Sequence, residues 1–107
     1  EKLHFSCHAD PAISAHLAAA ENRRQILVCG TEAHVCVLQS ALGLKQAGYD
    51  VFVVADACSS RTIKNLELAL RRFEAAGISV VSTEMVVFEL LEKAGTDLFR
   101  TLLRLIK

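Results

Sequence analysis

The sequence predicts an α/β fold in which helices cover both faces of a parallel β-sheet. Three short apolar runs, at residues 25–29, 51–55 and 78–82, have the length and continuity of buried strands. Two stretches with helical periodicity, 33–48 and 62–77, separate these runs, and each is closed by a glycine that is typical of a helix C-terminus. Alternation of this kind indicates parallel strands joined by helical crossovers.

Three further helices complete the predicted order of elements. "DPAISAHLAAAE" places Asp10 as an N-cap and Pro11 in the first helical position, which predicts a short helix before the first strand. "TEMVVFELLEK" and "TDLFRTLLRLIK" predict two closing helices, the second capped by Thr96. With 107 residues and no linker-like segment, the chain fits a single domain.

The first strand lacks a neighbour in this pattern. Right-handed crossovers put both connecting helices on one face of the sheet, so only the first and the closing helices remain for the other face. The strand at 25–29 is also too apolar for an exposed sheet edge. The sequence therefore predicts part of a larger sheet, with another segment beside residues 25–29.

Charge and composition argue against several classes of protein. The chain has 12 basic and 12 acidic side chains, whereas a nucleic-acid or anionic-membrane surface needs a basic excess. No apolar run approaches the roughly 20 residues of a membrane span, and no secretion signal opens the chain, so we expect a cytosolic protein with reduced cysteines. Its cysteines and histidines lack zinc-type spacing, which predicts no metal site.

Cys36 is the first candidate for chemistry. In doubly wound α/β folds, ligands bind outside the carboxyl ends of the strands, and residues 30–36 follow the strand 25–29 directly. A thiol in the first turn of a helix meets unpaired amides and the positive end of the helix dipole, both of which favour a thiolate. The alternative is a small buried side chain, because free cysteines are so often part of the core.

The other candidates each have a simpler interpretation as well. Arg61 follows the second strand and is placed to bind an anionic group of a substrate, or it is a surface residue at a helix start. His34 precedes Cys36 by two residues and is a second candidate for contacting a substrate. Cys29 and Cys58 flank strand ends and are most simply core residues. Lys2, taken alone, is a terminal lysine.

The stretch "ILVCGTEAHVCVLQSALGLKQAGYDVFVVADACSSR" resembles the isochorismatase-like cysteine hydrolase superfamily. The family pattern is an apolar strand, a glycine six residues before Cys-Val at a helix start, a helix closed by glycine, and a strand ending in Asp-Ala. The versions of the motifs in this sequence are most similar to those of the isochorismatase-domain-containing hydrolases, and "SVVSTEMVVFELL" is similar to the same branch. The resemblance implies a three-layer α/β/α, Rossmann-like isochorismatase fold, here without its N-terminal strands.

The resemblance also implies a set of catalytic residues. Members of the superfamily use a Cys, a Lys and an Asp together, which places the nucleophile at Cys36. The lysine falls at Lys2, because "KLHFS" is similar to the family's K-x-x-F-S motif. The family's Asp lies upstream of that lysine, at a position that these 107 residues do not contain, and Asp10 and Asp56 do not match it.

In the family, a cis peptide aims one of the two backbone amides that hold the oxyanion. By resemblance, that cis bond is expected between Thr31 and Glu32, with the amides of Glu32 and Cys36 as the two donors. The metal of some nicotinamide-hydrolysing relatives is bound by upstream residues, so we expect no metal and no cofactor here.

The function that follows is hydrolysis of a small amide-like or related substrate by a Cys nucleophile through a thioester. One alternative is a true isochorismatase or nicotinamidase. Another is a non-catalytic oligomerisation module that has kept the fold. The apolar closing helices, "TEMVVFELL" and "TDLFRTLLRLI", predict a homo-oligomer, a dimer or higher, which is also common in the family.

Overall fold

The computed structural model describes residues 4–20, 22–92 and 94–106; Lys2 lies outside them. The elements follow the predicted order, with the second strand longer than expected and the helix at 33–48 opening in a π-helical turn, η1. Their bounds are α1 (Pro11–Ala18), β1 (Gln25–Gly30), η1 (Ala33–Val37), α2 (Leu38–Gln46), β2 (Asp50–Cys58), α3 (Ile63–Ala75), β3 (Ser79–Val81), α4 (Thr83–Leu91) and α5 (Asp97–Ile106).

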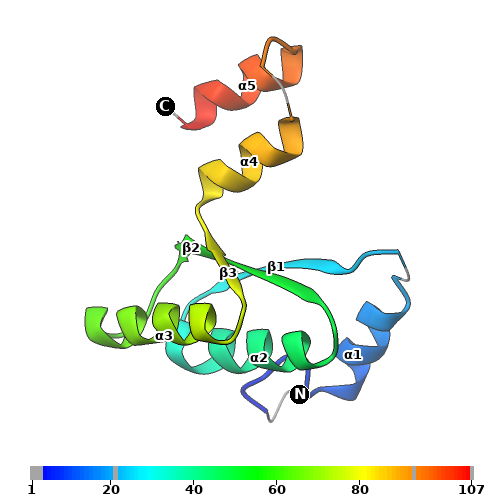
Figure 1. Cartoon of the computed structure of the whole chain (residues 1–107), viewed down its shortest axis with the longest axis vertical. Coiled ribbons are helices and arrows are strands. Elements are labelled where there is room, and N and C mark those ends of the chain that lie inside the picture. Colours follow the sequence, from blue (N-terminus) through cyan, green and yellow to red (C-terminus); the bar gives the residue numbers. More distant parts are fainter. Residues whose placement is uncertain (1–3, 21, 93, 107) are drawn as a thin grey trace.

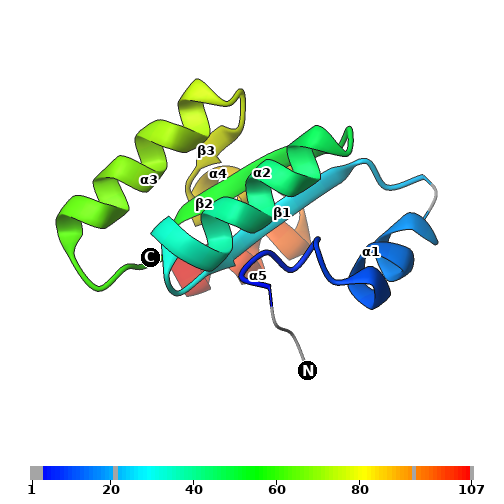
Figure 2. The ribbon, with the colours of Figure 1, turned by 90° about the horizontal axis from the view of Figure 1, so that it is seen from below.

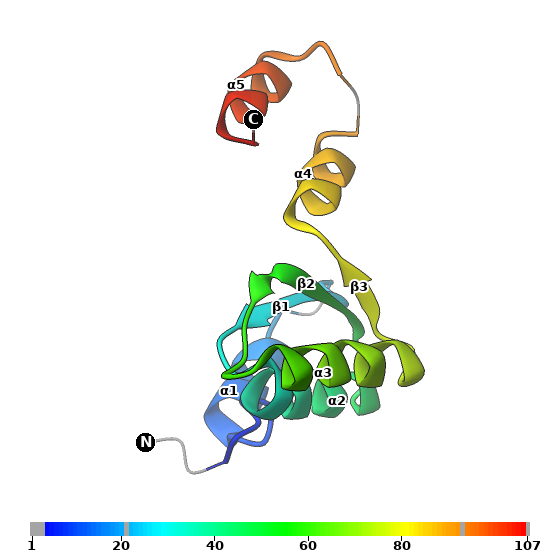
Figure 3. The same ribbon diagram turned by 90° about the vertical axis from the view of Figure 1, so that its left-hand side faces the viewer.

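The three strands form a parallel sheet in the order β1-β2-β3. Ile26 pairs with Val51, and Phe52 with Ser79. Helices α2 and α3 lie together on one face of this sheet, as right-handed crossovers require (Figures 1 and 3). Seen from that side, the two helices run roughly along the strands, and β1 forms the edge nearest α1 (Figure 2). The predicted α/β fold with a parallel sheet is therefore confirmed.

The hydrophobic core fills the space between the sheet and the two crossover helices. Val53, Phe73 and Ile78 have the largest side chains that are fully enclosed there. Along β1 the side chains alternate, as the pleat of a strand requires. Ile26 and Val28 pack against this core, whereas Leu27 points away from it and is 52% exposed.

The opposite face of the sheet is only partly covered. Helix α4 leaves β3 on that side and packs against β2, and α5 lies farther out (Figures 1 and 3). Between α4 and the sheet is a groove of about 310 Å³, whose apolar lining includes Leu27, Phe52 and Leu90. Helices thus lie on both sides of the sheet, but one side retains a large apolar surface that this chain does not bury.

The predicted helix ends are present in the structure. The carboxylate of Asp10 accepts hydrogen bonds from two amides of the first turn of α1, with Pro11 in the first helical position. The hydroxyl of the predicted cap Thr96 accepts from the amide of Phe99. Thr62, which was predicted to lie inside its helix, instead caps α3, and its hydroxyl accepts from the amide of Asn65. These caps satisfy amide groups that otherwise have no partner within the helix.

Replacing Phe73 tests whether the core is arranged in this way. Phe73 is completely buried, so Phe73→Ala is expected to lower the free energy of unfolding by about 3–5 kcal/mol. Leu68→Ala is the matched control on the same helix; Leu68 is 45% exposed, and about 1 kcal/mol or less is expected there. Urea unfolding followed by circular dichroism measures both. Equal losses in the two variants would contradict the position of α3.

Candidate active site at the carboxyl ends of the strands

The ends of β1 and β2 are joined by backbone hydrogen bonds. Gly30 pairs with Cys58 beyond an irregularity in the register, which separates them from the regular ladder. The amide of Ser59 then donates to the carbonyl of Gly30 at 3.2 Å, and the amide of Ala33 donates to the carbonyl of Ser59 at 2.7 Å. The loops after the two strands are therefore held side by side, at the edge where parallel α/β sheets bind ligands.

Cys36 lies in the π-helical turn that follows β1. The carbonyl of Glu32 accepts hydrogen bonds from the amides of Val35, at 3.0 Å, and Val37, at 3.4 Å; the second, from five residues along the chain, is the π-type bond that widens this turn. The Cys36 side chain is half-buried and lines a hollow of about 420 Å³, here called the Cys36 hollow. Its lining is formed by Cys7, Leu27, Val28, Cys29, Gly30, Thr31, Cys36, Val37, Ser40 and Leu44. The candidate nucleophile, Cys36, thus lies in a concavity beside β1.

The expected cis peptide between Thr31 and Glu32 is not found, and this expectation is wrong. The described residues contain no cis peptide bond. The chain turns here instead through Glu32, which adopts a left-handed conformation with φ 55° and ψ 57°. A left-handed residue reverses the direction of the backbone without isomerisation of the peptide bond.

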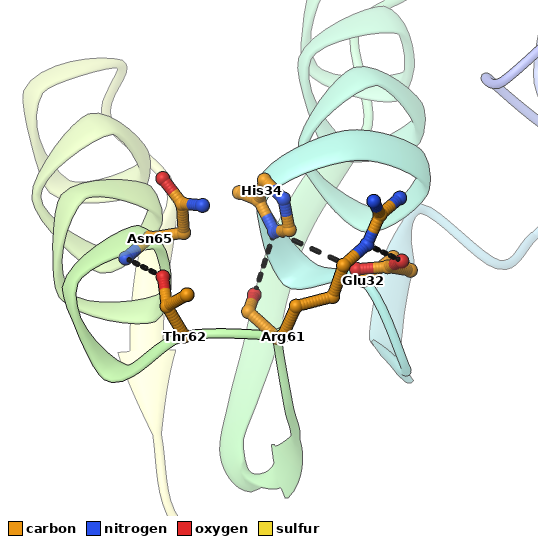
Figure 4. A network of polar contacts seen from close by, with 6 residues as sticks. Glu32, His34, Arg61, Thr62 and Asn65 are labelled. Carbon is orange, nitrogen blue, oxygen red and sulfur yellow. Dashed lines mark hydrogen bonds and ion pairs between the residues drawn. The ribbon is translucent and has the colours of Figure 1, made fainter.

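Arg61 and His34, the two expected substrate contacts, both meet the carboxylate of Glu32 (Figure 4). The Nε group of Arg61 donates to Glu32 Oε1 at 2.6 Å, although the Arg61 side chain is 76% exposed. Nδ1 of His34 lies 2.9 Å from Ser60 Oγ and 3.8 Å from Glu32 Oε2. The structure therefore brings residues from the two strand ends into one polar cluster.

This cluster is not an acid–histidine–serine relay. Both contacts of His34 use the same ring nitrogen, whereas a relay needs the acid and the serine on opposite nitrogens. Oε2 of Glu32 is buried, and none of the described residues donates a hydrogen bond to it. What the arrangement offers is a guanidinium held through Nε, which leaves its terminal nitrogens available to an anionic group.

The other cysteines lie in different environments. Cys7 and Cys29 are exposed, so the expectation that Cys29 belongs to the core is wrong. The reason is that Cys29, like Leu27, projects from the face of β1 that faces away from α2. Cys58 is half-buried and packs against the core. Burial raises the pKa of the Cys58 thiol, and the neighbouring Cys29 and Asp56 raise it further, against a backbone hydrogen bond from Gly30.

Sequence reasoning missed the role of Asp56 at the end of β2. Its carboxylate accepts hydrogen bonds from the amide of Thr83 at 2.8 Å and from the hydroxyl of Thr83 at 2.9 Å. These two bonds hold the pKa of Asp56 below its usual value. Asp56 therefore fixes the start of α4 to the sheet. The only signal was an Asp at a strand end, which does not reveal a partner 27 residues away.

The described residues contain neither a cluster of metal-ligating side chains nor a membrane-spanning helix. Within residues 4–20, 22–92 and 94–106, no three His, Cys, Asp or Glu side chains form a group suited to a metal ion. Over the same residues, no helix is both long and apolar enough to cross a membrane.

A family profile described as "Isochorismatase domain" matches residues 1–85. The chain belongs to the isochorismatase family. The matched region contains both strand ends, with Cys36, Glu32 and Arg61. The resemblance inferred from the strand–glycine–cysteine pattern is thereby confirmed.

Two relatives show how much of a family protein is represented here. The "Secreted isochorismatase effector Isc1" of Phytophthora sojae is 42% identical over 108 residues, which is 100% of this chain and 51% of that protein. "Isochorismatase domain-containing protein 2" of Bos taurus is 36% identical over 97 residues, 91% of this chain and 48% of that protein. The chain spans about half the length of these curated relatives.

This chain also covers about half of each of two solved structures that have the same fold. The MAR1 ribonuclease from Caenorhabditis elegans matches with a TM-score of 0.86 and 31% identity over 98% of this chain and 53% of that one. The nicotinamidase SaPncA from Staphylococcus aureus matches with a TM-score of 0.70 and 24% identity, over 76% and 50%. The second likeness is one of fold alone.

The contact between Asp56 and Thr83 predicts a pH effect on stability. Because the folded pKa of Asp56 is lowered, its stabilising effect is complete above the unfolded value of about 4 and is lost as pH falls through the folded pKa. Wild type is therefore expected to exceed Asp56→Asn in stability at neutral pH, with the difference narrowing below about pH 4. Urea midpoints against pH measure this, with Asp50→Asn, at the other end of β2, as control. A difference independent of pH would contradict it.

Proposed function

We propose that the protein is a cysteine hydrolase of the isochorismatase family that acts on a small amide-like or related substrate. The observation that carries the proposal is the position of Cys36. It lies in the first turn after β1, at the ligand-binding end of the sheet, and lines a hollow there. Family membership supports hydrolase chemistry at this position.

In the proposed reaction, the thiolate of Cys36 adds to the carbonyl carbon of the substrate. Expulsion of the amine leaves a thioester on Cys36, and water then hydrolyses this thioester. The backbone amide of Cys36 is our remaining candidate for holding the oxyanion, since the cis peptide that would aim the amide of Glu32 is not present. Lys2, assigned by resemblance, would hold the charge of the family's upstream Asp, which exchanges the protons.

Arg61 supports a substrate that carries an anionic group. Its Nε is held by Glu32, which restricts the position of its terminal nitrogens beside the loop after β1. His34 lies next to the same carboxylate and is the second proposed substrate contact.

Two alternatives remain in view. A true isochorismatase or nicotinamidase would use the same residues and differ in substrate. A non-catalytic oligomerisation module would keep the fold without the family's Asp. An Asp at the end of an upstream apolar strand favours the enzyme, and its absence favours the module.

We also propose that the protein works in the cytosol. The support is that the four cysteines do not lie in disulfides, and a reducing compartment keeps such thiols unpaired. The alternative is export, since the relative from Phytophthora sojae is named as secreted.

Replacing Cys36 tests the proposed nucleophile. In the full-length protein, Cys36→Ala is expected to lower kcat by on the order of 10⁴–10⁶-fold, as removal of a nucleophile does in other hydrolases. Cys58→Ala, which removes a thiol from the neighbouring strand end, is expected to keep most of the activity. Turnover is measured on a panel of small amides, nicotinamide and isochorismate. Limiting iodoacetamide, followed by peptide mapping, should label Cys36 before the other cysteines. The assignment would be refuted if Cys36 were not labelled and its replacement left kcat unchanged.

We further propose that the protein is a homo-oligomer assembled through α4 and α5. Large apolar side chains are exposed on both helices, among them Leu90 at 76% and Leu105 at 78%. Multi-angle light scattering of the full-length protein is expected to give a dimer or higher species. Leu105→Glu should shift this species toward the monomer, whereas Leu68→Glu on α3 should not. A clean monomer of wild type at micromolar concentration would contradict the proposal.

A further inference from the structure

The segment before α1 lies directly on α2. The amide of Cys7 donates a hydrogen bond to Ser40 Oγ at 2.8 Å, and this hydroxyl is part of a buried residue. A side chain added at Gly43 would lie 3.5 Å from Ser6 Oγ and 3.6 Å from the Cβ of His8. Residues 6–8 are therefore in contact with two successive turns of α2 and follow its surface (Figure 2).

Cys36 lies on the continuation of this contact surface. Cys36, Ser40 and Gly43 are spaced by four and three residues, which places them in one row along the helix. Helical side chains lean toward the N-terminus, so the row leads from the Cys7–Ser40 contact toward Cys36. Cys7, Ser40 and Cys36 also line the same hollow. Two thiols from distant parts of the chain thus face one concavity.

We propose that Cys7 is a resolving thiol for Cys36, so that a peroxide converts the two into a reversible disulfide that blocks the nucleophile. This regulatory meaning rests on the function proposed for Cys36. Cys7 is exposed, and residues 4–10 form bends and turns without a helix or strand. Such a segment can adjust to the Cα separation of about 4.4–6.8 Å that a disulfide requires.

The chemistry balances with a peroxide as the oxidant. The Cys36 thiolate attacks one peroxide oxygen, the O–O bond breaks, and Cys36 becomes a sulfenic acid while hydroxide leaves. The Cys7 thiolate then attacks the Cys36 sulfur, the S–O bond breaks, and water is formed after protonation. Two electrons pass from the two thiols to the peroxide. Thiol exchange with a reductant restores both cysteines.

The other two thiols are less suited to this role. Cys29 projects from the face of β1 that lies opposite α2, although it reaches the edge of the same hollow. Cys58 is half-buried on β2, where burial raises the pKa of its thiol and so disfavours the attacking thiolate. Cys29→Ser is therefore the matched control for Cys7→Ser, because both variants remove an exposed thiol from the lining of one hollow.

The test is to treat the full-length protein with limiting hydrogen peroxide and to map its disulfides after trypsin digestion without reduction. Trypsin cuts after Arg23, Arg24, Lys45 and Arg61, so Cys7 and Cys58 fall on separate peptides, and fragmentation distinguishes Cys29 from Cys36. We expect a Cys7–Cys36 bridge in wild type and in Cys29→Ser. In Cys7→Ser this bridge is absent. When the peroxide is then raised to excess, a second peroxide oxidises the Cys36 sulfenic acid to sulfinic acid and is reduced to water, and dithiothreitol does not reverse this step.

Loss of recoverable Cys36 thiol in Cys7→Ser, but not in Cys29→Ser, supports the proposal. A bridge from Cys36 to Cys29 or Cys58, or equal recovery of the Cys36 thiol in the three proteins, overturns it. Hydrolysis on the amide panel is measured in parallel. A bridge that forms without changing hydrolysis would refute the catalytic role of Cys36 and the switch together, whereas loss of hydrolysis in Cys36→Ala without any bridge would refute the switch alone.

Discussion

The pairing of β1 with β2 is the constraint on which the rest of this structure depends. Without it, the loop that carries Glu32 and Cys36 and the loop that carries Arg61 would be separated by an entire crossover. The carbonyl and amide of Ser59 complete the pairing beyond the regular ladder, through Ala33 and Gly30. Every proposed substrate contact in the described part of the chain depends on that junction. A substitution that shifts the register between β1 and β2 at this junction would therefore separate the proposed site residues even where the sheet stays folded.

In the part of the chain that the structure describes, the core that supports this junction lies on one side of the sheet. Helices α2 and α3 bury the inner side chains of the strands, whereas the outer face keeps Leu27 half exposed and an open groove beneath α4. The Cys36 hollow lies beside β1, which pairs with β2 alone among the described residues. The chain spans about half of its relatives, and the surface left open is continuous with the proposed active site. The groove under α4 and the Cys36 hollow share Leu27 in their linings, so the open apolar face and the proposed site meet at β1.

Local patterns in the sequence predicted the elements of the fold. Asp10 with Pro11, and Thr96 as a cap, contact residues only two or three positions away, so their partners follow from the local sequence. The position of Cys36 directly after a strand could be predicted for the same reason. The contacts of Asp56 and Cys7 were not, because they join residues 27 and 33 positions apart. The trans peptide at Glu32 was missed because a resemblance of sequence does not determine a backbone angle.

The left-handed backbone of Glu32 has a consequence for any attempt to engineer this protein. A residue with a Cβ is disfavoured at φ 55° and ψ 57° by about 1–2 kcal/mol, and glycine is free of that penalty. Selection for thermal stability alone would therefore favour glycine at this position. The same substitution would remove the carboxylate that holds Arg61, so the guanidinium would be released into solvent. Stability and order at the site therefore compete at this one residue, because the more heat-resistant variant would no longer hold the Arg61 guanidinium.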